Sequence, residues 1–225
     1  IDSTMGRYSH ENKLKDFADG KYDILLGTQM VAKGLDFENV TLVGVINADQ
    51  QLNNDDFRSQ ERTFDLLTQV VGRAGRGQYK GTAVIQTCNP ENDVIQIAAR
   101  QDYDAFFKDE LKTRKILIYP PYCDICLIGF IGENEPKVRV ASQKYTDRLK
   151  EKLSGEYKDL KIIALGPMTA RVSKISNKFR YRLILKCKNT KRFRALMNEL
   201  LKYTGTDKAY NDVSVYIDIN PENII

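Results

Sequence analysis

Two arginines and a glutamine occupy the end of an apolar stretch that is predicted to be a helix. Gln69, Arg73 and Arg76 lie within the sequence Gln-Val-Val-Gly-Arg-Ala-Gly-Arg-Gly at residues 69–77. The arginine side chain is planar and always charged, so it can bind a phosphate through two hydrogen bonds. Gln69 could hold an attacking water or a terminal phosphate, and an arginine could stabilise charge in the transition state. The spacing favours phosphoryl-transfer chemistry, although most Arg-x-x-Arg pairs are only basic turns.

A glycine-containing loop occurs in a similar setting nearer the start of the chain. Residues 27–36 read Gly-Thr-Gln-Met-Val-Ala-Lys-Gly-Leu-Asp and directly follow an apolar run at 22–26. Small residues allow the backbone to turn sharply and to lie close to a ligand. This loop, with Gly34 and Asp36, and the helix end together predict one half of a nucleotide-binding site.

The first half of the chain is predicted to be an α/β domain that positions these two segments. Apolar runs at 22–26, 40–46 and 82–87 are continuous, as in parallel strands that helices cover on both faces. One predicted helix would carry Gln69 in its last turn. Helices are expected at about 9–17, 57–71, 91–100 with Asn89 as its cap, and 103–114.

The second half is predicted to be a ferredoxin-like domain, because its elements follow the order strand, helix, strand, strand, helix, strand. The segment 179–187 alternates, with Phe179 and Tyr181 on one face and Arg180 and Arg182 on the other. Strands are expected at 125–131, at 162–173 with a break at Gly166-Pro167, at 179–187 and at 213–219, and helices at 137–153 and 193–201.

Composition indicates a soluble globular protein of the reducing cytoplasm. Apolar residues make up 42% of the 225 residues and charged residues 29%. The apolar runs fall short of the roughly 20 residues that span a bilayer, so no membrane contact is expected. Four cysteines do not form a disulfide framework. Ile1 opens what looks like the end of a strand, so we expect a piece of a longer protein.

Charge divides the chain near the predicted domain boundary. We expect domains at 1–100 and 122–225, joined by a helical connector at 101–121. Residues 1–121 carry 15 basic and 18 acidic side chains, a net charge of −3, whereas residues 122–225 carry 20 and 12, a net charge of +8. A basic half beside a mildly acidic one suggests that the second half meets a polyanion.

The most basic tract extends from residue 160 to residue 198, with eleven basic residues and no acidic one. A solvated surface normally mixes both signs, so contact with nucleic-acid phosphates is favoured over a plain charged face. Such binding should weaken steeply with salt and carry no sequence preference. The predicted hairpin at 173–180 is the part expected to touch DNA. The candidate contacts are Arg171, Lys174, Lys178, Arg180 and Arg182.

Cys123 and Cys126 have the spacing of half a zinc site. A structural zinc site needs four ligands, and the other candidates are the isolated Cys88, Cys187 and His10. Because the pair enters an apolar strand, buried thiols are favoured, and no metal site is predicted in this chain.

The two nucleotide-site segments resemble motifs V and VI of superfamily 2 helicases. Motif V corresponds to residues 27–37 and motif VI to residues 69–77. The wider sequence is similar to the PriA family, bacterial primosomal DNA helicases that restart stalled replication forks. The resemblance covers essentially the whole chain and includes residues 2–5, 47–49, 55–58, 117–121, 165–167, 179–181 and 218–221.

The resemblance implies a RecA-like second motor lobe followed by a C-terminal DNA-binding domain. Its motifs make Arg76 the arginine finger, and Arg73 and Gln69 contacts to the γ-phosphate and the attacking water. The motif V loop implies nucleotide contacts from Gly34 and Asp36.

Thr28 would contact the DNA backbone by the same resemblance. Without the resemblance, Thr28 could equally be a hydroxyl at the end of a strand, and Asp36 could equally cap a loop.

The chain contains no Gly-Lys-Ser/Thr phosphate loop and no Asp-Glu-x-His motif. In the family these motifs hold ATP and Mg²⁺ on the first motor lobe, so this chain alone is expected not to hydrolyse ATP. The zinc-binding cysteines of the family also precede the part that this chain resembles. The intact enzyme is implied to move 3′ to 5′ on single-stranded DNA, with forks, single-stranded DNA-binding protein and primosome loading proteins as partners.

Two alternatives stay open on the sequence. The ferredoxin-like half could bind RNA or a protein, with the first half as a non-catalytic scaffold. The chain could also belong to a RecG-like fork-remodelling translocase, although the segments outside motifs V and VI argue against this.

Overall fold

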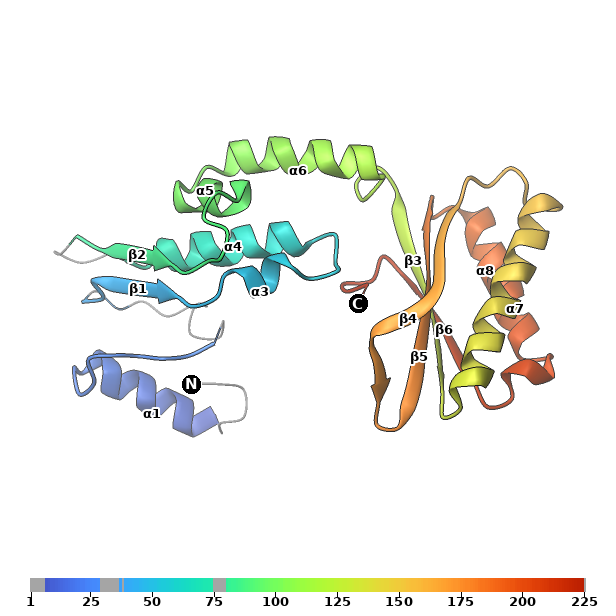
Figure 1. Cartoon of the computed structure of the whole chain (residues 1–225), viewed down its shortest axis with the longest axis horizontal. Helices are drawn as coiled ribbons and strands as arrows, with labels where there is room; N and C mark the ends of the chain where they lie inside the picture. The colour runs from blue at the N-terminus through green and yellow to red at the C-terminus, as the bar shows by residue number, and fades with distance from the viewer. Residues whose placement is uncertain (1–6, 29–36, 38, 75–79, 225) are drawn as a thin grey trace. The chain divides into compact units, whose positions relative to one another are not determined.

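The computed structural model describes residues 7–28, 37, 39–74 and 80–224, and it forms two compact units (Figure 1). The first unit consists of Ile1–Asn54 and Arg58–Glu110, and the second of Asp55–Phe57 and Leu111–Ile225. Helix α6 (Tyr103–Leu117) therefore begins in the first unit and ends in the second.

The described core of the first unit is a βαβ arrangement. Strands β1 (Leu42–Val45) and β2 (Thr82–Ile85) pair in parallel, and helix α4 (Ser59–Val71) lies between them in the sequence and beside them in space (Figure 1). Phe64 and Leu67 of α4 are buried against α5 (Asp93–Ala99) and Phe106, whose ring stacks on Phe64 at 4.2 Å between centroids. The unit also contains α1 (Arg7–Ala18) and α3 (Asp49–Leu52).

The expected strand at 22–26 is wrong. None of these residues is in a strand, and the side chains of Ile24 and Leu26 are 84% and 70% exposed. In the part of the first unit that the structure describes, alternate positions of the paired strands are exposed rather than buried, with Leu42 64% and Val84 54% exposed. An apolar run of five residues is too short for its hydrophobic periodicity to identify a strand. The sequence also does not show whether a partner strand is available.

The start of α5 differs from the prediction. The side-chain oxygen of Asn92 accepts hydrogen bonds from the amides of Val94 and Ile95 at 3.0 and 3.4 Å, so Asn92, not Asn89, caps this helix. The loop before it is held by Asp49, which accepts from the Thr87 hydroxyl at 2.7 Å and the Cys88 amide at 2.8 Å. Both hydrogen bonds lower the pKa of Asp49, and the bond from the Cys88 amide has the larger effect.

The second unit has the predicted ferredoxin-like order. An antiparallel sheet in the order β4-β5-β3-β6 is covered on one face by two helices (Figure 1). Its core contains Phe130, Tyr145, Leu183 and Phe193, all with no exposed surface. The elements are β3 (Asp124–Gly132), α7 (Glu135–Ser154), β4 (Ile163–Ile175), β5 (Lys178–Cys187), α8 (Lys191–Thr204), the short helix η1 (Lys208–Tyr210) and β6 (Ser214–Ile219).

Strand β4 is continuous, although the sequence predicted a break at Gly166-Pro167. The strand keeps its pairing with β5 by shifting register between Leu165 and Met168 and again between Thr169 and Lys174. At its end, Ser176 and Asn177 both have positive φ values, 48° and 65°, as in the two-residue turns that match the twist of a hairpin.

The face of the sheet opposite α7 and α8 carries a smaller apolar cluster at one end. Cys123, Ile125, Leu127, Ile184 and Ile224 are buried there, and Phe57 and Tyr119 pack against them. The rings of Phe57 and Tyr119 are parallel, with centroids 4.9 Å apart. The segment Asp55–Phe57, which the sequence placed in the first domain, therefore packs in the second unit.

Candidate nucleotide and nucleic-acid sites

Helix α4 brings two of the predicted nucleotide contacts to its C-terminal end. Gln69 lies in the last turn and is exposed, whereas the buried side chains Phe64 and Leu67 face the core. The Gly72 amide still donates to the Thr68 carbonyl at 3.0 Å, and the Arg73 amide donates to Val70 at 3.1 Å. Arg73 thus follows the helix in a turn, with its side chain half-buried.

The other predicted nucleotide residues, Gly34, Asp36 and Arg76, lie outside the described residues. Thr28, the expected DNA-backbone contact in the first unit, is exposed in a segment without regular structure. The described part of the chain therefore places Gln69 and Arg73 four residues apart at the end of α4, and the roles of all five nucleotide-site residues stay predictions.

The predicted DNA-binding side chains gather at the β4–β5 hairpin but divide between its two faces. Pairing of β3 with β5 ends at Phe179, so Lys178 and the turn extend beyond the last pair. Lys174 is opposite Phe179, and its Nζ lies 4.7 Å from the centre of that ring. Alternation on β5 places Lys178 and Arg180 on the face opposite the helices. Lys174, Lys178 and Arg171 are exposed, and Arg180 is half-buried.

Arg182 has a structural contact that the sequence did not indicate. Its Nη1 donates to the carbonyl oxygen of Ile224, whose amide donates to Asp56 Oδ2 at 3.2 Å. Asp56 is 5% exposed and Ile224 is 4% exposed. Arg182 therefore holds the C-terminal segment against the sheet, together with Asp56.

Lys186 is another basic residue of the tract that faces inward. It is 9% exposed, its Nζ donates to the Leu117 carbonyl at 2.6 Å, and it lies 3.7 Å from the centre of the Tyr119 ring. Desolvation lowers its pKa. A sequence count cannot find such contacts, because Leu117 and Lys186 are 69 residues apart.

The two cysteines with zinc-like spacing belong to different clusters. Cys126 is buried under the helices and Cys123 in the cluster on the opposite face. Burial raises the pKa of the Cys126 thiol to about 12, and likewise that of Cys187. Cys123 donates to the Ile118 carbonyl at 3.2 Å. In the part of the chain that is described, no three His, Cys, Asp or Glu side chains are grouped to hold a metal ion.

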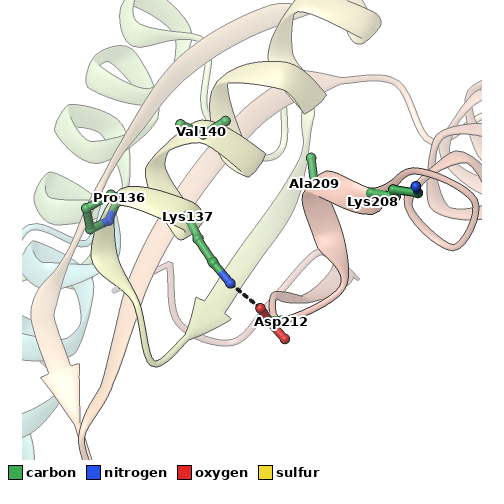
Figure 2. A pocket seen from close by; sticks show the side chains of 6 residues that line it. All are labelled: Pro136, Lys137, Val140, Lys208, Ala209 and Asp212. Carbon is green, nitrogen blue, oxygen red and sulfur yellow. Dashed lines mark hydrogen bonds and ion pairs between the residues drawn. The ribbon is translucent and has the colours of Figure 1, made fainter.

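A shallow hollow of about 320 Å³ lies between the start of α7 and the segment around η1. Figure 2 shows the Lys137 side chain reaching across it to Asp212, with which it forms an ion pair. Its lining is Pro136, Lys137, Val140, Lys208, Ala209 and Asp212. None of the predicted site residues lines this hollow. Among the described helices, none is long and apolar enough to cross a membrane.

Comparison with known protein families shows two matches in succession. Residues 1–78 match the helicase conserved C-terminal domain, and residues 115–222 match the primosomal protein N C-terminal domain. Three relatives, all named replication restart protein PriA, align with most of the chain. The protein from Bacillus subtilis is 40% identical over 98% of this chain, that from Synechocystis 41% over 82%, and that from Borreliella burgdorferi 36% over 100%. The chain spans 27%, 22% and 33% of their respective lengths.

Proposed function

Because the chain belongs to the PriA family of replication restart proteins, we propose that it supplies the second motor lobe and the DNA-binding domain of an ATP-dependent 3′–5′ DNA helicase. The observation that carries this proposal is the succession of a helicase C-terminal match and a primosomal C-terminal match on one chain. We assign the lobe to residues 1–100, a helical connector to 101–121 and the DNA-binding domain to 122–225.

ATP and Mg²⁺ would be held mainly by a first motor lobe, and this chain would complete the site. Gln69 is exposed in the last turn of α4 and Arg73 follows the helix two residues after its end, half-buried, and an amide and a guanidinium are both groups that can bind a phosphate. We assign them to the attacking water and the γ-phosphate, Gly34 and Asp36 to the nucleotide, and Arg76 to the charge that develops in the transition state. Without the first lobe the chain would not hydrolyse ATP.

The second unit would hold branched and single-stranded DNA through phosphates. The exposed cations at the hairpin, Arg171, Lys174 and Lys178 with Arg180 beside them, support this assignment. Arg182 would contribute by holding the C-terminal segment in place, since its guanidinium is engaged with Ile224. In the cytoplasm the complete protein would act at stalled forks, with single-stranded DNA-binding protein and primosome loading proteins as partners.

A competition experiment tests the DNA-binding part of this proposal on the chain itself. A labelled fork is displaced by unlabelled fork, single-stranded DNA or RNA of the same sequence, across a salt series, with fluorescence anisotropy as the readout. We expect DNA to compete better than RNA, and the logarithm of affinity to fall linearly with the logarithm of salt concentration. A preference for RNA would instead support a separate RNA-binding module.

A further inference from the structure

The aromatic ring of Tyr216 lies over Gly129 on the sheet face opposite α7 and α8. Gly129 of β3 is paired with Tyr216 of β6 on one side and with Arg182 of β5 on the other. A Cβ atom at Gly129 would lie 2.1 Å from Cε1 and Cζ of Tyr216. The ring of Tyr216 therefore lies across the glycine, with one face against the sheet.

The other side of this ring is open. Tyr216 is 38% exposed, which fits a ring with one covered and one free face. The apolar cluster on the same sheet face contains Leu127 and Ile184, one row from Gly129 in the direction of the Asp56–Ile224 contact. In the opposite direction the next row is Ser214, Ile131 and Arg180.

Positive charge accompanies the ring on this face. Arg182 is in the same row as Tyr216, Arg180 is in the next row away from the apolar cluster, and Lys178 follows on the same strand. The nearest acidic position on the same side of β6 is Asp218, one row towards the apolar cluster. An aromatic platform beside a basic strand is the arrangement with which proteins hold single-stranded nucleic acid, because every base has a face that can stack.

We propose that Tyr216 stacks on a base of single-stranded DNA, whose phosphates extend towards Arg180 and Lys178. The inference rests on the proposed function, since it places bases as well as phosphates on the same domain. Single-stranded DNA is the occupant because bases within a duplex are stacked on one another and cannot cover the tyrosine ring. If Tyr216 only shielded Gly129, replacing its ring would not change the affinity of the chain for single-stranded DNA.

The test compares two substitutions and two ligands in the full chain. Tyr216→Leu keeps an apolar group over Gly129 but removes the stacking surface, and Tyr216→Phe keeps the ring. The ligands are an oligothymidine of about 12 nucleotides and an abasic strand with the same number of phosphates. Fluorescence anisotropy gives the affinity at several salt concentrations, and thermal unfolding checks that both variants are folded.

We expect Tyr216→Leu to bind oligothymidine about 5–100-fold more weakly, as for the loss of one stacked base, and Tyr216→Phe to bind like the original chain. The abasic strand should bind equally to all three proteins, and the salt dependence should not change, because no charge is lost.

Oligothymidine binding that is the same in Tyr216→Leu and the original chain would overturn the stacking proposal alone. If the original chain binds neither strand at any salt concentration, the DNA-binding function fails together with it. If Tyr216→Leu does not fold, the proposal is tested by comparing the two ligands on the original chain. Equal affinity of the original chain for oligothymidine and for the abasic strand would then contradict stacking.

Discussion

In a polypeptide that joins this chain to a first motor lobe, Arg76→Ala is expected to lower DNA-stimulated ATP hydrolysis by about 10³-fold or more, with nucleotide binding largely kept. An arginine finger acts on charge that exists only in the transition state, and its contribution is typically about 10³–10⁵ in rate. Steady-state phosphate release measures the loss, and titration with a non-hydrolysable ATP analogue measures binding.

Lys108→Ala is a charge-matched control for this substitution. Lys108 is exposed on α6 and belongs to the first unit. Its removal also deletes one positive charge and should leave the rate unchanged. Equal rates in the Arg76→Ala protein and the unaltered protein would remove Arg76 from its assigned role.

Replacing Lys174, Lys178 and Arg180 together by alanine is expected to weaken single-stranded DNA binding by about 10²–10³-fold near 0.1 M salt. Each phosphate contact contributes about 0.7–0.9 to the slope of log affinity against log salt, so three lost contacts should reduce that slope by about 2–3. Anisotropy titrations of the full chain over a salt series measure both quantities.

Two controls separate charge at the hairpin from charge in general and from folding. Lys150, Lys158 and Lys202 are exposed on or beside the helices of the second unit, and their triple alanine variant loses the same charge. If it weakens binding as much as the hairpin variant does, the hairpin is not the site. Arg182→Ala should instead lower the free energy of unfolding by about 1.5–3 kcal/mol, because it removes a charged hydrogen bond to Ile224.

Periodic segments made most of the second unit predictable. The alternation of Phe179 to Cys187 indicated which side chains face the helices, and Leu183 and Leu185 are fully buried there. Its βαββαβ order is confirmed by the sheet, and the expected second motor lobe by the helicase match over residues 1–78. The resemblance to the PriA family is confirmed by relatives at 36–41% identity.

Contacts between residues far apart in the sequence could not be predicted. Arg182 and Lys186 count as surface cations in a charge profile, yet their partners are the carbonyls of Ile224 and Leu117, 42 and 69 residues away. Tyr216 shows no motif, and its place over Gly129 follows only from the register of β3 and β6. The prediction of a strand at 22–26 is wrong for the same reason, because a strand needs a partner strand and the sequence does not show which segment pairs with it.

Strand separation on substrates of opposite polarity tests the central claim, that this chain is the second lobe and DNA-binding domain of a 3′–5′ helicase. The polypeptide with a first motor lobe is given two partial duplexes, one with a 3′ single-stranded tail and one with a 5′ tail, with and without ATP. We predict ATP-dependent release of the labelled strand from the 3′-tailed substrate. Release only from the 5′-tailed substrate, or release that does not depend on ATP, would contradict the claim.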